Sequence, residues 1–411
     1  MQLKNNTYQI QGIDVLDICN EFGTPVYVYD SDKIKERYDS LKSAFSGQPV
    51  KIKYAAKALT NINILKYIKK LGAGLDVVSI QEAHLGIKAG FDPTDIMLTP
   101  NCVSFDEIRE AVDLGVQINI DNIPLLEQFG HEYGDSVPIC VRINPHILAG
   151  GNAKISVGHI DSKFGISILQ TRHLYRIVET HNIRVNGVHM HTGSDILDAE
   201  VFLRGAQVVF DIAKEFKNLE FLDFGSGFKV GYRDGDVTTD VFLLGKKLGS
   251  AIDKFAEEYG SKPEIWFEPG KYLVSESGFL FVKTNVIKTT PATAFVGVDS
   301  GMNHLLRPMM YDAYHDIINV SNPHGTKRVY SVVGYICETD TLGWDRALNE
   351  VKEGDILAIK NAGAYSFSMS SNYNSRFRPP EVMVYNGKAN LIRKRETFDD
   401  LIRNQVEISF D

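Results

Sequence analysis

Short apolar runs alternate with longer amphipathic stretches from Val26 to about Val274. The runs are rich in residues that favour β-strands, and the stretches between them have the spacing of helices that bury one face. Eight such runs occur: Val50–Ala56, Leu75–Ser79, Ile96–Thr99, Gln117–Ile120, Pro138–Asn144, Asn186–Met190, Leu219–Phe224 and Pro263–Phe267. Eight strands alternating with helices are the number that closes a (β/α)8 barrel, so the pattern predicts a TIM-like barrel over residues 26–274.

After Val274 the pattern changes to strands interrupted by Gly, Pro and Asn turns. Four strands are predicted first, at Phe279–Ile287, Ala294–Val298, Lys327–Val333 and Asp355–Lys360. Asn386-Gly387 then separates Val382–Tyr385 from Ala389–Ile392, which is typical of a two-residue hairpin turn. We therefore predict a second, all-β domain, a sandwich or barrel, from residues 1–25 and 275–411. The short strand expected at Tyr8–Ile10 would join it.

The composition of the 411 residues is that of an ordinary globular protein, with 44% hydrophobic and 23% charged residues. The net charge of -8 and the scattered Lys and Arg argue against nucleic-acid binding. The four cysteines have neither metal-ligand spacing nor the density of a disulfide scaffold, which favours a reducing compartment. No run approaches the roughly 18 to 20 apolar residues of a membrane span. We expect a cytoplasmic protein without a membrane segment.

Residues at the strand ends carry the candidate chemistry, because barrel active sites lie at the carboxyl ends of the strands. Lys57 follows the first strand, although on its own it would more often be a surface lysine. His189 and His191 end the sixth strand on one face. They could bind a metal, fill the core, or lie against an aromatic cofactor. No acid stands at zinc-like spacing, so no metal is predicted.

Two further strand ends add to this set. Gly225-Ser226-Gly227 follows the seventh strand, where small residues let backbone N–H groups approach a phosphate. Glu268 ends the eighth strand, where a buried carboxylate needs a partner such as a pyridinium nitrogen. Amine, imidazole, phosphate nest and carboxylate together are what pyridoxal phosphate requires. An acid at the ring nitrogen makes the ring a strong electron sink, which favours decarboxylation over racemisation.

The chain resembles the diaminopimelate decarboxylase family, within the alanine-racemase-like (fold-type III) barrel decarboxylases. The resemblance runs from Gly23 to Val382. Its motifs are Tyr54–Ala58, Gly74–Ser79, Ser162–Ile166, His189–Ser194, Glu268–Lys271, Arg307–Tyr311, Cys337-Glu338 and Asn361–Tyr365. The resemblance implies decarboxylation of meso-2,6-diaminopimelate to L-lysine and carbon dioxide, the last step of lysine biosynthesis.

The resemblance also implies roles for residues of the barrel domain. Lys57 would hold the cofactor as a Schiff base, His191 would stack on its ring, and Glu268 would pair with the ring nitrogen. Asp76 and Glu82 would flank the ring and help to place His191 and Lys57. The phosphate and its surroundings would be bound by Ser194, Gly225, Ser226, Gly227, Pro269, Gly270, Lys271 and Tyr365.

In the second domain, the resemblance implies that Arg307 and Tyr311 bind a substrate carboxylate, together with Lys271 and Tyr365. Cys337 would be the proton donor and Glu338 would bind the distal amine of the substrate. The family places this Cys-Glu pair across a dimer interface, which implies a homodimer with shared active sites.

Three positions depart from the family pattern: Lys271 replaces the usual Arg, Ser226 replaces a Gly, and His304 replaces an acid. Three alternatives stay open. The nearest is a sister decarboxylase acting on ornithine, arginine or carboxynorspermidine, which the Arg307, Tyr311 and Glu338 set disfavours. The others are an inactive homologue that binds a protein, and a racemase-like enzyme, which Glu268 disfavours.

Overall fold

The computed structural model describes residues 1–147, 160–191, 193 and 195–410. By its contacts the chain divides into two compact units. The barrel unit comprises Lys35–Gly231 and Val237–Leu273, and the β unit comprises Met1–Ile34, Tyr232–Asp236 and the chain from Val274 onward. Residues 26–30, with which we expected the barrel domain to begin, form a strand that was not predicted, β4 (Val26–Asp30), and it belongs to the β unit because it pairs with two strands there.

Eight parallel strands form a closed ring in the barrel unit, which confirms the predicted TIM-like barrel. They are β5 (Val50–Ala55), β6 (Gly74–Val77), β7 (Ile96–Leu98), β8 (Gln117–Ile120), β9 (Ile139–Asn144), β11 (Val185–Met190), β12 (Phe221–Asp223) and β13 (Glu264–Phe267). The ring closes because β13 pairs with β5 and β8 pairs with β9. A short strand that the sequence did not predict, β10 (Ile166–Ser167), pairs with Ile143 and Asn144 at the carboxyl end of β9.

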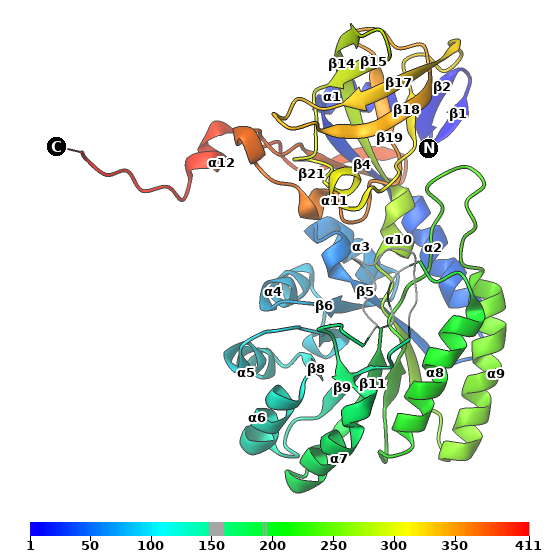
Figure 1. Ribbon diagram of the computed structural model, residues 1–411, viewed down its shortest axis with the longest axis vertical. Helices are drawn as coiled ribbons and strands as arrows, with labels where there is room; N and C mark the ends of the chain where they lie inside the picture. The colour runs from blue at the N-terminus through cyan, green and yellow to red at the C-terminus, as the bar shows by residue number, and fades with distance from the viewer. Residues whose placement is uncertain (148–159, 192, 194, 411) are drawn as a thin grey trace. The chain divides into compact units, whose positions relative to one another are not determined.

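Helices follow these strands and surround the ring (Figure 1). They are α3 (Ile62–Lys70), α4 (Ile80–Ala89), α5 (Phe105–Leu114), α6 (Ile123–Tyr133), α7 (Thr171–Thr180), α8 (Ala199–Ala213) and α9 (Val241–Tyr259). The helix α2 (Ser31–Ala44) precedes β5, and the single turn α10 (Lys271–Val274) follows β13. Among the described residues, no helix is both long enough and apolar enough to cross a membrane.

The interior of the barrel changes from apolar to polar along the strands. Side chains two residues apart on a strand share a face. One interior cluster is apolar and buried: Met97, Cys140, Phe221 and Trp266. The residues two positions later, on the strands or directly after them, are polar and also buried: Thr99, Arg142, Asp223 and Glu268. The carboxyl ends of the strands therefore enclose polar side chains, supported from below by an apolar layer in which the Phe221 and Trp266 rings stack at 3.6 Å.

The β unit is built on a mixed sheet with the order β18-β17-β15-β14-β4-β20-β21, to which β19 and β16 add at β14. Its further strands are β14 (Gly278–Thr289), β15 (Ala294–Val298), β16 (Ile317–Asn319), β17 (Lys327–Val333), β18 (Thr341–Asn349), β19 (Ile356–Ile359), β20 (Glu381–Tyr385) and β21 (Lys388–Arg393). The predicted hairpin is confirmed, since Asn386 and Gly387 have φ angles of 51° and 68° between β20 and β21. The strands β16 and β18 were not predicted.

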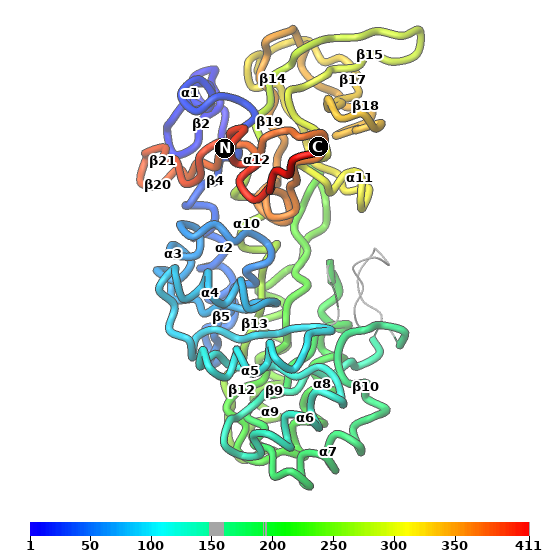
Figure 2. The backbone as a smooth tube through the Cα atoms, turned by 90° about the vertical axis from the view of Figure 1, so that its left-hand side faces the viewer, coloured from blue at the N-terminus to red at the C-terminus, as the bar shows by residue number. Residues whose placement is uncertain are grey.

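The N-terminal residues join the β unit by packing rather than by strand pairing. Strand β2 (Thr7–Ile10) pairs only with β1 (Gln2–Lys4) and β3 (Ile13–Asp14). Ile10, together with residues of α1 (Val15–Phe22), lies in one buried cluster with β4, β14 and β20. Figure 2 shows β2 and α1 beside β20 and β21. The expected association of this segment with the second domain thus rests on side chains.

Lys53 lies inside the barrel at the level of the apolar layer. Its side chain is fully buried, and its Nζ lies 4.2 Å from the centre of the Trp266 ring. The ammonium donates a hydrogen bond of 2.9 Å to the Asp95 carbonyl. Burial, followed by the charge of Lys51, lowers the pKa of Lys53 from 10.5 to about 7.

Replacing Lys53 by Met should flatten the pH dependence of stability. Because the folded-state pKa of Lys53 is lowered, the unfolded chain binds more protons between pH 7 and 10.5, and the free energy of unfolding rises with pH. One such group contributes at most about 1.4 kcal/mol per pH unit. Urea unfolding across this window should show a smaller slope for Lys53→Met. Lys66→Met, exposed on α3, should keep the wild-type slope; an unchanged slope for Lys53→Met would contradict the prediction.

Candidate active site

Lys57 lies in the single turn Ala56–Ala58 directly after β5. Its side chain is 40% exposed, and its Nζ lies 3.8 Å from Oδ2 of Asp76, whose side chain is fully enclosed at the end of β6. Burial and then the charge of Glu268 raise the pKa of Asp76 to about 8, although Lys57 opposes this shift. The structure therefore combines an accessible amine with a buried acid, an arrangement that suits a lysine that reacts with a cofactor.

Glu268 follows β13 and is buried with its carboxylate pointing toward β11. Its Oε2 lies 3.1 Å from Nε2 of His189, whereas its Oε1 is buried and has no hydrogen-bond partner in the described part of the chain. A buried carboxylate oxygen without a donor costs free energy unless a ligand supplies one. The protonated ring nitrogen of pyridoxal phosphate is such a donor, so the site fits this cofactor.

The charge of Glu268 is maintained by its neighbours. Burial raises the pKa of this carboxyl, but the hydrogen bond with His189 and the nearby charge of Lys57 oppose burial, and the pKa lies below its usual range. Asp223 lies close by, and its own pKa is raised well above the usual range by burial and by Glu268. Ligand atoms of His189, Asp223 and Glu268 all lie within 4.8 Å of one another. The sequence did not reveal Asp223 and Glu268 as neighbours of His189, because they lie far from it along the chain. Glu268 lies close to His189 because the two side chains share a hydrogen bond.

His191 follows β11, and its Nδ1 accepts a hydrogen bond of 3.3 Å from the backbone N–H of Ser226. Burial, then the nearby charge of Lys57, lowers the pKa of His191 to about 3, so the imidazole is neutral. A neutral, flat ring held in this way suits the predicted stacking on the cofactor. The same bond occupies the Ser226 amide, which we had expected to bind phosphate.

The segment Gly225–Gly227 needs two glycines for its backbone path. Gly225 has φ 61°, and a Cβ there would lie 2.7 Å from Nδ1 of His191. Gly227 has φ 117°, and a Cβ there would lie 2.6 Å from the Gly193 carbonyl oxygen. Ser226 does not belong to the positive-φ residues of the described chain, which explains why serine is tolerated at this position. Ser194, the other predicted phosphate ligand, lies outside the described residues.

Two predicted residues already have partners within the barrel unit. Glu82 accepts a 3.0 Å hydrogen bond from the Val78 N–H, and its own N–H donates to Oγ of Ser79, the N-cap of α4. Nζ of Lys271 lies 2.5 Å from Oδ1 of Asp195. The ammonium that replaces the usual guanidinium is thus held by an acid that sequence reasoning missed, because the two residues are far apart along the chain.

In the β unit, Arg307 and Tyr311 are the first and last residues of α11 (Arg307–Tyr311). The guanidinium of Arg307 lies 5.9 Å from the centre of the Tyr311 ring and 5.6 Å from that of Tyr232. Its Nε is buried without a hydrogen-bond partner among the residues that the structure describes. A guanidinium N–H that lacks an acceptor suits the predicted binding of a carboxylate.

Cys337 and Glu338 are exposed in the β unit and contact two residues that the sequence analysis did not identify. The hydroxyl of Tyr373 donates a 2.8 Å hydrogen bond to Oε1 of Glu338 and lies 3.7 Å from Sγ of Cys337. Nδ2 of Asn374 lies 3.0 Å from the same sulfur. The hydrogen bond to Glu338 raises the pKa of Tyr373 to about 12. The only local signal for this pair was the Asn-rich turn in which it lies.

His304, for which sequence offered no interpretation, has a structural role. It is fully buried, and its two ring nitrogens lie 3.0 Å from Oγ of Ser300 and 3.0 Å from the Phe377 carbonyl oxygen. Burial lowers its pKa to about 4, so it is neutral. Tyr365, predicted to bind phosphate, is half-buried with φ 54°, and its role stays a prediction.

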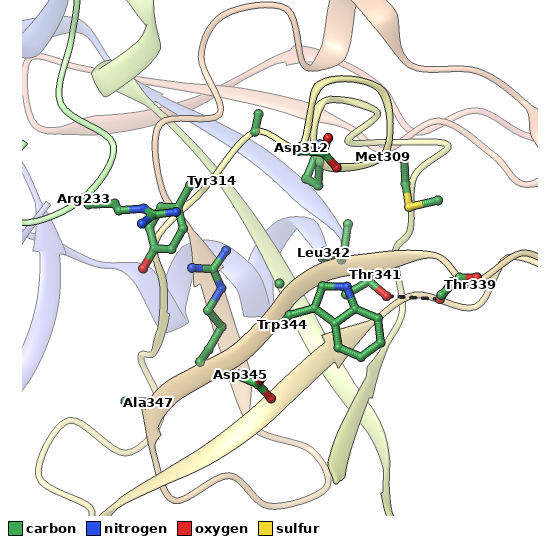
Figure 3. A pocket seen from close by; sticks show the side chains of 14 residues that line it. Arg233, Met309, Asp312, Tyr314, Thr339, Thr341, Leu342, Trp344, Asp345 and Ala347 are labelled. Carbon is green, nitrogen blue, oxygen red and sulfur yellow. Dashed lines mark hydrogen bonds between the residues drawn. The ribbon is translucent and has the colours of Figure 1, made fainter. Parts of the chain in front are cut away.

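A cavity of about 780 Å³ lies in the β unit between α11 and β18. Figure 3 shows the side chain of Arg233 beside the ring of Tyr314, with Trp344 on β18 across the cavity. The guanidinium carbons of Arg233 and Arg346 lie 4.2 Å and 3.6 Å from the centre of the Tyr314 ring. Pro308 and Met309 of α11 line this cavity, but Arg307 and Tyr311 do not, so it is distinct from the predicted carboxylate site.

Comparisons with known proteins agree with this geometry. A model of the pyridoxal-binding domain of pyridoxal-dependent decarboxylases matches residues 31–275. The diaminopimelate decarboxylase of Methanothermobacter thermautotrophicus is 39% identical over 406 residues, which cover 96% of this chain and 95% of that protein. The crystal structure of the diaminopimelate decarboxylase of Methanocaldococcus jannaschii matches with a TM-score of 0.91 and 32% identity, over 99% of this chain and 98% of that one.

A second structural relative was solved with a bound ligand. It is the diaminopimelate decarboxylase of Helicobacter pylori in complex with L-lysine, with a TM-score of 0.86 and 34% identity. The match covers 95% of this chain and 98% of that one.

Lys57→Ala should abolish the covalent attachment of pyridoxal phosphate, because Nζ of Lys57 lies beside the buried Asp76, whereas Nζ of Lys271, the other lysine predicted to bind the cofactor, is paired with Asp195. Borohydride reduction followed by mass spectrometry should label Lys57 in the wild type and leave the variant unlabelled. Lys88→Ala, exposed on α4, should be labelled at Lys57 like the wild type. Labelling of another lysine in the wild type would show that Lys57 is not the attachment site.

Proposed function

Because the chain belongs to the diaminopimelate decarboxylase family of pyridoxal-dependent decarboxylases, we propose that it converts meso-2,6-diaminopimelate to L-lysine and carbon dioxide. This reaction is the last step of lysine biosynthesis. The observation that carries the proposal is the buried Glu268 carboxylate, whose Oε1 lacks a hydrogen-bond partner within the described chain while Oε2 is bound by His189. An anion fixed at this point suits a cofactor whose ring nitrogen has to stay protonated.

The residues of the barrel unit would divide the work of the reaction. Bound pyridoxal phosphate supplies an electron sink for the pair released when the Cα–carboxylate bond breaks. Lys57 would hold the cofactor through its Nζ. Glu268 keeps a proton on the ring nitrogen electrostatically. The neutral His191 covers one face of the ring and limits the access of water.

The residues of the β unit would bind the far end of the substrate and return a proton. Arg307, through its unpaired Nε–H, and Tyr311 bind the distal carboxylate, and Glu338 binds the distal amine. Cys337 delivers a proton to Cα after carbon dioxide leaves. Tyr373 holds the Glu338 carboxylate in place through its 2.8 Å hydrogen bond. From the barrel unit, Lys271 would add positive charge near the substrate, which its ion pair with Asp195 partly neutralises.

The assembly in this proposal is a homodimer with shared active sites. Cys337 and Glu338 lie on the β unit and are exposed, so a second subunit would have access to them. In the dimer, each pair would complete the site around Lys57 of the partner subunit. The substrate would then be enclosed by residues from two chains.

A substrate panel tests the proposed function directly. The purified protein, loaded with pyridoxal phosphate, is offered meso-diaminopimelate, ornithine, arginine and lysine, and carbon dioxide release is measured. Since the last three lack a distal carboxylate with a neighbouring amine, we expect diaminopimelate to be preferred by at least about a hundredfold in kcat/KM. Preference for ornithine or arginine would replace the proposed substrate by that of a sister decarboxylase. Cofactor binding without any turnover would favour an inactive homologue.

Mixing two inactive variants tests the shared active site. Lys57→Ala and Cys337→Ala homodimers should each be nearly inactive. If their subunits are exchanged, each mixed dimer contains one site with both residues intact, so about a quarter of wild-type activity should return. Refolding the variants together and assaying carbon dioxide release measures this recovery. Variants that stay inactive after confirmed subunit exchange would place Cys337 and Lys57 of one chain in the same site.

A further inference from the structure

His189 is a buried, titratable residue to which the proposed reaction assigns no task. Its side chain is 1% exposed, and it projects from β11 into the polar layer of the barrel. It contacts Glu268 on β13 even though β12 lies between these two strands, so the two side chains meet inside the ring. Nδ1 of His189 is buried and has no hydrogen-bond partner in the described residues.

We propose that His189 is a positioning residue that donates its Nε2–H to Oε2 of Glu268, keeping this carboxylate anionic and its Oε1 directed to the cofactor ring nitrogen. The inference rests on the proposed function, because it requires that Glu268 pairs with that nitrogen. It goes further by naming the group that sets the charge and the orientation of Glu268.

The hydrogen-bond inventory fixes the tautomer of His189. A carboxylate only accepts hydrogen bonds, so Nε2, at 3.1 Å from Oε2, has to carry the proton. If the imidazole is neutral, Nδ1 carries no proton. The absence of a hydrogen-bond partner at Nδ1 then leaves no N–H donor buried without an acceptor. A protonated imidazole would leave a charged N–H buried without an acceptor, which is costly. Burial lowers the pKa of His189, which agrees with the neutral form.

His189 decides which of three buried acids keeps its negative charge. Asp76, Asp223 and Glu268 face the same interior, and like charges this close cannot all be ionised. Burial raises the pKa of all three, but only Glu268 receives a hydrogen bond from an imidazole. Without this bond, the proton would be shared among the acids, and Glu268 would lose its advantage.

Other charged or titratable groups face Glu268 from neighbouring elements, and they stay in place when His189 is changed. They are Asp76 on β6, Arg142 on β9, Asp223 on β12, Lys57 after β5 and His191 after β11. Lys57 and Arg142 are cationic and favour the Glu268 anion, whereas Asp76 and Asp223, whose pKa values are raised, oppose it only when they are ionised. A change at His189 therefore tests one hydrogen bond against a constant background.

The matched variants His189→Gln and His189→Asn separate the hydrogen bond from the space that the imidazole fills. The amide nitrogen of Gln can reach the place of Nε2, whereas that of the shorter Asn ends near the place of Nδ1 and cannot reach Oε2. Both residues are polar and neutral. Any general loss of packing should affect both variants, but only the Asn variant should lose the hydrogen bond to Oε2 of Glu268.

Two measurements test the variants without relying on turnover: the protonation of the cofactor ring nitrogen and the affinity for the cofactor. Cofactor with a labelled ring nitrogen is bound to each protein, and nitrogen NMR reports across a pH series whether this atom is protonated. Fluorescence titration of the cofactor-free protein gives the dissociation constant for pyridoxal phosphate. A hydrogen bond to a charged group is worth about 1.5–3 kcal/mol, or roughly a tenfold to hundredfold change in binding.

His189→Gln should bind the cofactor within about threefold of wild type and keep the ring nitrogen protonated at neutral pH. His189→Asn should bind at least about tenfold more weakly and show at neutral pH the unprotonated nitrogen signal of Glu268→Gln. The pH at which the ring nitrogen loses its proton should be unchanged in His189→Gln and lower in His189→Asn, close to that of Glu268→Gln, because a carboxylate that has lost its donor holds the pyridinium proton less well. This shift in the titration of the ring nitrogen, present in the Asn variant and absent in the Gln variant, is the signature that a purely structural role would not produce.

Equal nitrogen signals in the Gln and Asn variants would overturn the inference, as would a wild-type signal in His189→Asn. Should the Asn variant fail to fold, as judged by circular dichroism, His189→Phe supplies the donor-free comparison with the same criteria. The substrate panel is independent of these measurements. A protein that binds the cofactor but prefers another amino acid would contradict the proposed substrate and leave the result on His189 intact.

Discussion

The structure of this site depends on one enclosed negative charge. The carboxylate of Glu268 is only 6% exposed, and a buried carboxylate is tolerated only when donors and cations compensate for the lost water. This charge affects the groups around it. His189 donates a hydrogen bond to the carboxylate, the pKa values of Asp76 and Asp223 are raised, and Lys57 interacts with it electrostatically. Oε1 has no hydrogen-bond partner among the described residues, so it is available to a donor from a bound ligand.

In the barrel, the residues that stabilise the fold and the residues that carry the chemistry lie in two adjacent layers, two positions apart along the strands. Met97, Cys140, Phe221 and Trp266 form an apolar layer, and the residues two positions later carry the polar chemistry. The same alternation that points one side chain into the ring points its successor in as well, one level nearer the carboxyl ends. The apolar layer can therefore stabilise the fold while the polar layer, which costs stability, holds the charges that a cofactor needs.

Local patterns were sufficient to predict much of this molecule. All eight barrel strands were placed within about two residues because alternating strands and helices leave a strong periodic signal. The Asn386-Gly387 hairpin was found because its turn chemistry is local. Val26–Asp30 was expected in the barrel but lies in the other sheet, since a short apolar strand does not encode its partner. The same limit explains why β16 and β18 were missed.

The two histidines of the sixth strand show what a motif cannot supply. His189 and His191 share a face and lie two residues apart, yet one donates to Glu268 and the other accepts from the Ser226 N–H. These partners come from β13 and from the loop after β12, so no local pattern separates the two roles. A family resemblance identifies the residues that contact the cofactor. The residues that set the charge of those groups emerge only from the folded chain, because their effect depends on contacts between distant strands.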